Sequence, residues 1–414
     1  MTLIQIAALG LVLISLVNWL NARLLRLSPS IAMVGAGLIG ALALLAAQSL
    51  IGPFWGFSDV RSMVGRLNFS SAVLDDLLGF LLFAGGLQVD LRELRKRQAP
   101  VWTLATLGVV LSTLLVGFGV WAAGQAIGAD LPLAWALAFG ALISPTDPIA
   151  VAGAMRTGAV SPRLGAVLQG EALFNDGVGF VVFTAAAGFA ASGTAPQALH
   201  TLGAIALESG GALALGWACA SLTVLIFRQV DDAAARVAAT FALAIGVYVA
   251  AGLLHLSGPI AAAVAGLAVG GSDLMDPAEP SSHDIEVVWD VVDRLLNAGL
   301  FLLLGLQVFV LPFELDEVGL WAAATLLVMV ARLAVVLPWG AFYRFRHEER
   351  GASAILTWGG LRGAVSLALA LTLPDDAYRD TLLAMTFIVV TFSVVVQGLT
   401  LAPMARRWGG AKSS

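Results

Sequence analysis

Long apolar stretches follow one another along almost the whole chain, and they constrain its fold more than any other feature. A helix that crosses the hydrocarbon core of a bilayer needs about 20 mostly apolar residues. Of the 414 residues, 59% are hydrophobic and only 12% are charged, whereas a soluble domain carries about a quarter charged residues. Because so few charges cannot cover a water-facing surface, we expect an all-α polytopic membrane protein. The stretches predict thirteen transmembrane helices, at residues 3–21, 30–51, 70–90, 98–127, 131–154, 165–190, 200–227, 235–254, 257–271, 286–310, 317–341, 351–373 and 380–404.

Charge and cysteine content exclude several classes of partner and cofactor. The net charge is only −5 and no basic stripe is present, so we expect no nucleic-acid partner. Cys219 is the only cysteine, which excludes an intrachain disulfide and a cysteine-based metal centre. We therefore expect no cofactor, and the lipid bilayer as the main partner.

The distribution of basic residues predicts the orientation, because cytoplasmic loops retain Lys and Arg. With the N-terminus outside, the inner connections and the C-terminal tail hold 16 of the 22 Lys and Arg. The outer connections hold only Arg61, Arg66 and Arg379. We thus expect a multi-pass protein of the cytoplasmic membrane with its C-terminus in the cytoplasm. All connections are short, so residues 1–414 should form one transmembrane domain without a soluble C-terminal domain.

An internal repeat is visible in the sequence GLQV, which occurs at 86–89 and again at 305–308. The copies lie in the third and tenth predicted spans, an offset of seven helices, and an odd offset means that they cross the bilayer in opposite directions. Inverted repeats are typical of secondary transporters. We expect repeats at roughly 30–227 and 235–404. The alternative is that the two GLQV sequences match by coincidence in a leucine-rich chain.

Two predicted spans, related by the same offset of seven helices, contain helix-breaking sequences. The fifth reads SPTDP at 144–148, where Pro145 and Pro148 remove helix hydrogen bonds. The twelfth reads GGLRG at 359–363, and its glycines permit non-helical backbone. Lipid offers no partners for free backbone groups, so the two breaks should line a cavity or meet each other. The glycines of the second break are Gly359, Gly360 and Gly363.

Five ionisable residues lie inside predicted spans near these breaks. A charge at membrane depth costs several kcal/mol unless it is paired or hydrated, so each is a hypothesis for function. The alternative is a set of buried ion pairs that only holds helices together. The five are Asp147, Glu171, Asp176, Arg332 and Arg362.

Helical geometry separates the two acids of the sequence EALFND. Glu171 and Asp176 are five residues apart, which is roughly 140° around a helix, so they cannot share a face. Asp176 shares its face with the small residues Ala172 and Gly179, which leaves room for an ion or water. Glu171 shares its face with Asn175 and should point at a neighbouring helix. A buried glutamate needs a cation, for which both buried arginines are candidates.

Asp147 and Asp176 then remain for ion binding. Burial and a second carboxylate nearby both disfavour the charged form of an aspartate, so such a group can hold either a proton or a small cation. Competition for one carboxylate is itself an exchange mechanism. The Thr146 hydroxyl, the Asn175 amide and main-chain carbonyls of SPTDP would supply further oxygens, which hard cations prefer.

Four segments, in this order and spacing, resemble the monovalent cation:proton antiporter family of bacterial NhaP and animal NHE exchangers. The resemblance covers nearly the whole chain. The segments are LLFAGGLQVDLRELRK (81–96), SPTDP (144–148), EALFNDGVGFVVF (171–183) and TWGGLRGAVSLALAL (357–371).

The resemblance implies a NhaA-like inverted-repeat fold with two crossing discontinuous helices, and a homodimer. It implies exchange of Na⁺ or Li⁺ for H⁺ by an elevator-like motion, with a role in pH homeostasis. The Asn-Asp form of the motif implies electroneutral exchange. Matching the motifs of the family to this sequence implies that Asp176 binds the cation or proton and that Asn175 orients that site. Asp147 and Thr146 come from the broken helix, and the resemblance assigns Glu171 to a structural ion pair with Arg332, leaving Arg362 as the competing partner.

One departure from the family pattern leaves the cation open. Many members have serine after the motif glutamate, where this chain has Ala172, so one oxygen ligand is missing and K⁺/H⁺ exchange is an alternative. A channel and a Na⁺-coupled symporter are further alternatives. Intramembrane aspartyl proteases are expected to carry a GxGD-type motif, which neither Asp147 nor Asp176 has, so we expect no enzymatic activity.

Overall fold

The computed structural model of the chain is almost entirely helical, and it describes residues 3–51, 77–89, 91–193, 198–275, 280–311, 313, 315–347 and 351–409. Nine helical stretches in this part are long and apolar enough to cross a membrane. Two shorter apolar helices and two interrupted helices bring the described segments to thirteen, in agreement with the sequence. The start of the third predicted span (70–76) and the basic residues Arg61, Arg66, Arg350 and Lys412 lie outside the described residues.

Helix α11 begins where the sequence supplies a cap. The Ser161 hydroxyl accepts the N–H of Leu164 at 3.3 Å, and Pro162 fills the first helical position of α11, a combination that favours helix initiation. The helices of the first half are α1 (Leu3–Leu20), α2 (Pro29–Ile51), α5 (Leu78–Gln88), α6 (Leu91–Lys96), α7 (Gln98–Thr103), α8 (Val109–Ile127), α9 (Leu133–Ile143), α10 (Ile149–Arg156), α11 (Pro162–Ser192) and α12 (Ala198–Phe227).

The second half repeats this arrangement of long and interrupted helices. Its helices are α13 (Ala233–Leu253), α14 (Gly258–Gly270), α15 (Pro280–Leu306), α16 (Val318–His347), α17 (Ala352–Trp358), α18 (Ala364–Leu371), α19 (Arg379–Phe392) and α20 (Gly398–Gly409). Two π-helical turns, η3 (Leu104–Gly108) and η7 (Ser393–Gln397), join α7 to α8 and α19 to α20. Short turns are η1 (Asn21–Leu25), η4 (Asp273–Met275), η5 (Gln307–Phe309) and η6 (Leu315–Glu317).

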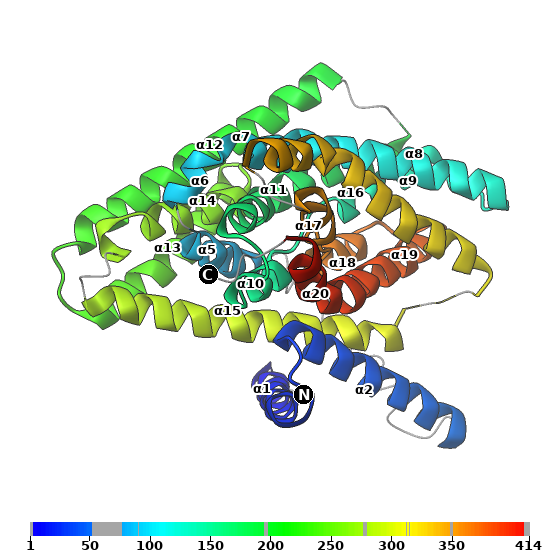
Figure 1. The fold of residues 1–414 in the computed structure, drawn as a ribbon, viewed down its shortest axis with the longest axis horizontal. Coiled ribbons are helices and arrows are strands. Elements are labelled where there is room, and N and C mark those ends of the chain that lie inside the picture. Colours follow the sequence, from blue (N-terminus) through cyan, green and yellow to red (C-terminus); the bar gives the residue numbers. More distant parts are fainter. Residues whose placement is uncertain are drawn as a thin grey trace.

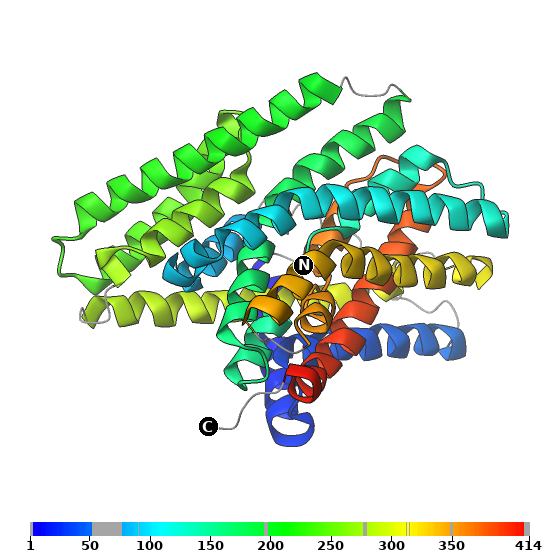
Figure 2. The same ribbon diagram turned by 45° about the horizontal axis from the view of Figure 1, so that its top comes forward.

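The helices form two groups, each of which packs mainly within itself. In the flanking group (α1, α2, α5 and α12–α15), α5 packs on α14, α2 on α15, and α12 and α13 on α14. In the crossing group (α7–α11 and α16–α20), α8 packs on α9 and α16, α9 on α11, and α16 on α17. Figures 1 and 2 show α12 and α13 on one side of the molecule and α8 and α16 on the other.

Close helix contacts reproduce the internal repeat. The glycine of each GLQV copy touches the backbone of another helix. A Cβ at Gly86 would lie 2.8 Å from the backbone nitrogen of Leu267 in α14, and a Cβ at Gly305 would lie 2.8 Å from the Cα of Gly37 in α2. Both copies therefore occupy positions where only glycine fits. The two helix pairs, α5 with α14 and α15 with α2, correspond to each other when each helix is matched with the one seven spans away. The boundaries of the two repeats stay a prediction.

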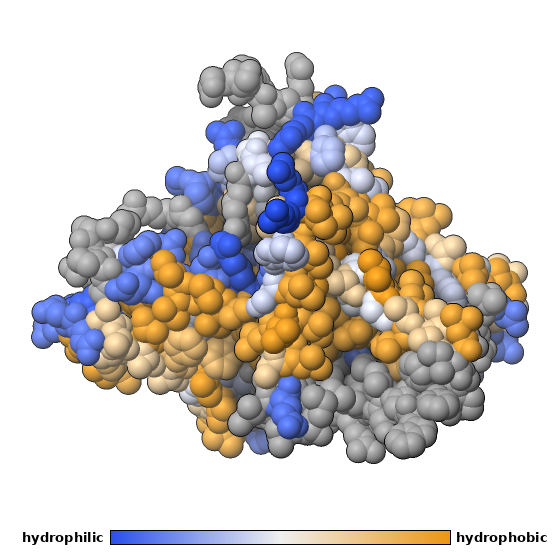
Figure 3. Space-filling model, turned by 90° about the horizontal axis from the view of Figure 1, so that it is seen from below, coloured by the Kyte–Doolittle hydropathy of each residue, from blue (hydrophilic) through white to orange (hydrophobic). Residues whose placement is uncertain are grey.

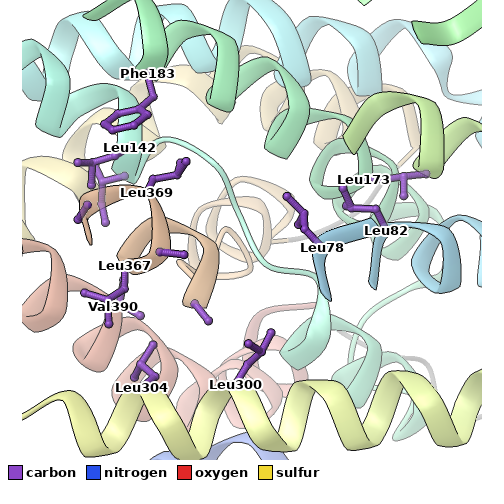
Figure 4. Packing of buried hydrophobic residues seen from close by; sticks show 14 of the residues in the cluster. Leu78, Leu82, Leu142, Leu173, Phe183, Leu300, Leu304, Leu367, Leu369 and Val390 are labelled. Atoms are coloured by element: carbon purple, nitrogen blue, oxygen red, sulfur yellow. The ribbon is translucent and has the colours of Figure 1, made fainter. Parts of the chain in front are cut away.

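The outer surface of the bundle is largely apolar, as lipid requires. Exposed side chains on widely separated helices include Ile39, Leu107 and Leu207, each more than 60% accessible. Figure 3 shows broad apolar areas on one face, with hydrophilic residues on its left side and in a column that descends from the top toward the middle. The interior is also apolar, and Figure 4 shows leucines of α5, α11, α15 and α18 around the centre of the molecule. Polar side chains at this centre are therefore exceptional.

Candidate functional site

The fifth span unwinds at the centre of the molecule. Helix α9 ends at Ile143 and α10 begins at Ile149, so SPTDP forms a non-helical linker. Pro145 and Pro148 account for this break, because neither has an N–H to continue the helical ladder. Here the structure agrees with the sequence prediction.

The twelfth span unwinds at the same place, and the two linkers cross. Helix α17 ends at Trp358 and α18 begins at Ala364. The Asp147 N–H donates to the Leu361 carbonyl at 2.8 Å, in an antiparallel bridge. Backbone groups freed by the two breaks thus satisfy each other where lipid and apolar side chains cannot.

Two arginines bind the C-terminal ends of the broken helices. The Arg362 guanidinium donates to the carbonyls of Ser144 and Pro145, the latter at 2.9 Å, just past the end of α9. Arg332 donates through Nε to the Leu356 carbonyl in α17 at 3.2 Å. Since a helix C-terminus carries partial negative charge, both contacts stabilise an end that is buried away from water.

Two polar side chains that the sequence did not indicate hold the second break. The Ser393 hydroxyl accepts the N–H of Arg362 at 2.8 Å, and Gln397 donates to the Trp358 carbonyl at 3.3 Å. Both belong to the π-helical turn η7, which joins α19 to α20. Polar residues in an otherwise apolar span were the only available signal.

The glycines of GGLRG serve a purpose that differs from the one predicted. None of them has the left-handed backbone that favours glycine. Each instead lies against another group: a Cβ at Gly359 would lie 2.8 Å from Leu168, and a Cβ at Gly360 would lie 2.7 Å from the guanidinium carbon of Arg332. A Cβ at Gly363 would lie 2.8 Å from the Cβ of Asp147. The break needs glycine for space rather than for backbone freedom.

Glu171 and Arg332 form a buried, bidentate ion pair. Both terminal guanidinium nitrogens donate to the carboxylate, one of them at 2.8 Å, and the side chains are only 2% and 5% exposed. The pairing links α11 to α16. Arg362, the competing candidate, binds main-chain carbonyls instead.

Asn175 holds the first break rather than lining the cavity described below. Its amide donates to the Thr146 hydroxyl at 2.7 Å, and both side chains are buried. The amide oxygen of Asn175 is buried and has no hydrogen-bond donor among the described residues. Asn175 thus fixes Thr146 in place beside Asp147.

A cavity lies between the two helix groups and reaches the crossing point. Asp147, Thr146 and Asp176 all line it, together with Ala172. Within the described part of the chain, no hydrogen bond or ion pair engages the Asp176 carboxylate. Gly179, expected on the same face, packs against Pro145 instead. The remaining polar lining residues are Gln88, Gln169, Asp293, Asn297 and Ser366.

The surroundings of these acids define what the site can do. Glu171 is neutralised by an arginine and lies outside the cavity lining, whereas Asp147 and Asp176 face the cavity. Asp147 lies against Gly363, at the N-terminus of α18, where a helix favours negative charge. The site can therefore hold a small cation or a proton among carboxylate, hydroxyl and carbonyl oxygens.

Comparisons with known proteins agree with the fold of the chain. The profile of the transmembrane sodium/hydrogen exchanger family matches residues 10–407. The chain is 36% identical to the Na⁺/H⁺ antiporter NhaP of Pseudomonas aeruginosa, over 98% of this chain and 97% of that protein. It is 33% identical to the Na⁺/H⁺ antiporter NhaH of Halobacillus aidingensis, over 94% of each. The structure of the sodium proton antiporter MjNhaP1 from Methanocaldococcus jannaschii superimposes with a TM-score of 0.75 at 21% identity, covering 98% of both chains.

Proposed function

Because the chain belongs to the transmembrane sodium/hydrogen exchanger family, we propose that it is a secondary antiporter that exchanges Na⁺ for H⁺. Li⁺ is a further substrate in this proposal, and the exchange is electroneutral. The proposed location is the cytoplasmic membrane.

The observation that carries this proposal is the placement of Asp176. Its carboxylate lines the central cavity together with Asp147, beside two crossed and unwound helices. Water and ions can reach a carboxylate in such a cavity, whereas Glu171 is held by Arg332. A proton and a cation then compete for Asp176, and each transport step carries one or the other.

The two helix groups suggest how the site alternates between the two sides. The acids and both breaks belong to the crossing group, while α5 and α15 of the flanking group form the opposite wall of the cavity. We propose an elevator-like motion in which the crossing group slides along that wall. The Glu171–Arg332 pair moves as part of the rigid crossing group and keeps α11 and α16 together.

The distribution of basic residues supports an inward-facing state. Gln88, at the end of α5, is exposed and lines the cavity, so the cavity opens near this residue. Arg92, Arg95, Lys96 and Arg97 follow it directly. With such residues in the cytoplasm, the cavity opens inward, the N-terminus lies outside and the C-terminus inside.

Cation choice and assembly belong to the same proposal. Ala172 lines the cavity one turn before Asp176 and offers no hydroxyl, so K⁺/H⁺ exchange is the alternative substrate class.

We also propose that the protein is a homodimer. Helix α1 exposes apolar side chains along most of its length, among them Leu11, Val12 and Trp19, which suits contact with lipid or a second copy.

Purified protein in proteoliposomes tests the function directly. A pH gradient is set, and fluorescence dequenching is followed on addition of Na⁺, Li⁺ or K⁺ at several pH values. Na⁺ should release protons in the wild type. Asp176→Asn should remain folded and lose the response, because a neutral amide exchanges neither ion.

The outcomes separate the alternatives. A response to K⁺ alone would identify a K⁺/H⁺ antiporter, and Na⁺ uptake without proton movement would indicate a channel or a symporter. Full activity of Asp176→Asn would contradict the assignment of this residue.

A further inference from the structure

A third carboxylate lines the central cavity, on the wall opposite the two acids of the crossing. Asp293 belongs to α15, and Asn297, one turn later, donates its amide to the Asp293 carboxylate at 2.9 Å. Leu300 and Phe301 continue the same face of the helix and also line the cavity. Only Asp293 and Asn297 make this face polar.

Asp293 lies on the side of the crossing from which the cavity opens. Phe301 lines a second small pocket with Asp147 and Arg362, so this part of α15 is next to the crossing. Asp293 precedes Phe301 by eight residues, or about 12 Å along the helix. The N-terminal end of α15 lies on the side of Gln88, because Leu91 packs against Gly271 shortly before α15 begins.

We propose that Asp293 and Asn297 form a second, weaker cation site that captures the ion at the cavity mouth before it reaches Asp147 and Asp176. The Asp293 carboxylate supplies charge, and Asn297 fixes its orientation through the amide. A single carboxylate with an amide beside it attracts a monovalent cation and releases it readily. This proposal rests on the antiport function proposed above.

The position of the second site in the flanking group makes its effect one-sided. Asp147 and Asp176 belong to the crossing group and move with it in an elevator-like cycle. Asp293 stays on the opposite wall. It therefore serves ions that enter through the cavity seen here, and it cannot serve ions that enter from the other side of the membrane.

The test is Asp293→Asn, with the Na⁺ dependence of exchange measured from each side in vesicles of defined orientation. Removal of one carboxylate from the entry path should raise the KM for Na⁺ roughly fivefold from the side of Gln88. The KM from the other side and the maximal rate should stay at wild-type values. Asp293→Glu should restore the low KM, since it keeps the charge.

Asp290→Asn is the matched control. Asp290 lies on the same helix, makes an exposed ion pair with Arg294 at 2.7 Å and does not line the cavity, so its loss should leave both KM values unchanged. Equal KM values for Asp293→Asn and wild type, or a fall in maximal rate from both sides, would overturn the second site. Absence of exchange in the wild type would instead contradict the proposed function itself.

Discussion

At the scale of single residues, the two acids of EALFND have opposite surroundings within one helix. Glu171 is almost fully buried and bound by Arg332, whereas Asp176 lines the cavity. The rotation of roughly 140° between them presents one to α16 and the other to the central cavity. Position on the helix therefore separates a residue that holds helices together from the one that we propose as the ion carrier.

Glu171→Gln should lower stability rather than remove a ligand. The change leaves Arg332 charged and buried without its carboxylate, and breaking one partner of a buried pair costs about 3–5 kcal/mol. We expect a clearly lower Tm for the purified protein in detergent, measured by thermal unfolding.

Asp290→Asn provides the comparison at an exposed pair. The side chains of Asp290 and Arg294 are 37% and 61% exposed, and exposed pairs contribute at most about 1 kcal/mol. Its Tm should match that of the wild type. A Glu171→Gln protein that is as stable as wild type but inactive would place Glu171 in the ion path instead.

Charged residues in apolar spans could be predicted to matter, but neutral polar ones could not. An unpaired charge at membrane depth is so costly that the position of Glu171 within an apolar span is enough to predict a cationic partner. Ser393 and Gln397 cost less to bury, and nothing in their neighbours indicates which break they serve. Asn175 was expected to orient the site and to offer its amide oxygen to the ion. Its amide nitrogen donates to Thr146, and its amide oxygen has no donor among the described residues, so the second expectation stays a prediction.

At the scale of helices, the two breaks depend on each other. One backbone hydrogen bond joins the linkers, and arginines bind the C-terminal ends of α9 and α17. Gly363 brings the second linker directly against Asp147. The position of the Asp147 carboxylate is thus set by the partner helix as much as by its own.

Gly363→Ala should displace the Asp147 carboxylate. The added methyl group would lie 2.8 Å from the Cβ of Asp147 and 3.0 Å from its Cγ, so this side chain must move. We expect about a tenfold rise in the KM for Na⁺, equivalent to about 1.4 kcal/mol, in a protein that still folds. The measurement is ion-dependent dequenching together with Tm.

Gly153→Ala is the control for the methyl group. Gly153 is exposed in α10, and a Cβ there meets nothing within 4 Å. Alanine favours a helix over glycine by about 1 kcal/mol, so this variant should be at least as stable and fully active. Wild-type ion affinity in Gly363→Ala would show that Asp147 does not depend on this contact.

Helix positions could be predicted well, but their irregular turns could not. The first break lies at the prolines, as the sequence predicts. Helix α15 begins at Pro280 rather than at the predicted residue 286, because polar residues extend its N-terminal end beyond the apolar stretch. The π-helical turn Ser393–Gln397 has no residue that demands it. Its residues Ser393 and Gln397 contact the broken helix, and this contact is not local in sequence.

At the scale of the whole molecule, the central cavity follows from the division into two helix groups. The repeated GLQV predicted related halves, and Gly86 and Gly305 make equivalent contacts. The halves nevertheless do not coincide with the two groups, since each group takes helices from both. Spans that are apolar all round carry no periodic signal for their neighbours, so the wall of the cavity that carries Asp293 could not be predicted.

The charge balance of the crossing group leads to a prediction about voltage. In the proposed cycle, the internally neutral Glu171–Arg332 pair stays intact in every step. If Asp176 carries one proton in one direction and one monovalent cation in the other, the moving group has the same charge both ways. One net charge per cycle would be worth about 2.3 kcal/mol per 100 mV, so electrogenic exchange would respond steeply to potential.

We therefore expect Na⁺/H⁺ exchange in proteoliposomes to be almost independent of an imposed diffusion potential. A potential of about 100 mV of either sign should change the initial rate less than about twofold, whereas transfer of one net charge could shift the exchange equilibrium roughly fiftyfold. A voltage-sensitive dye confirms that the potential is present during the assay. A rate that rises and falls with the sign of the potential would mean that a second proton crosses, and Asp147 would be its first candidate carrier because it faces the same cavity as Asp176.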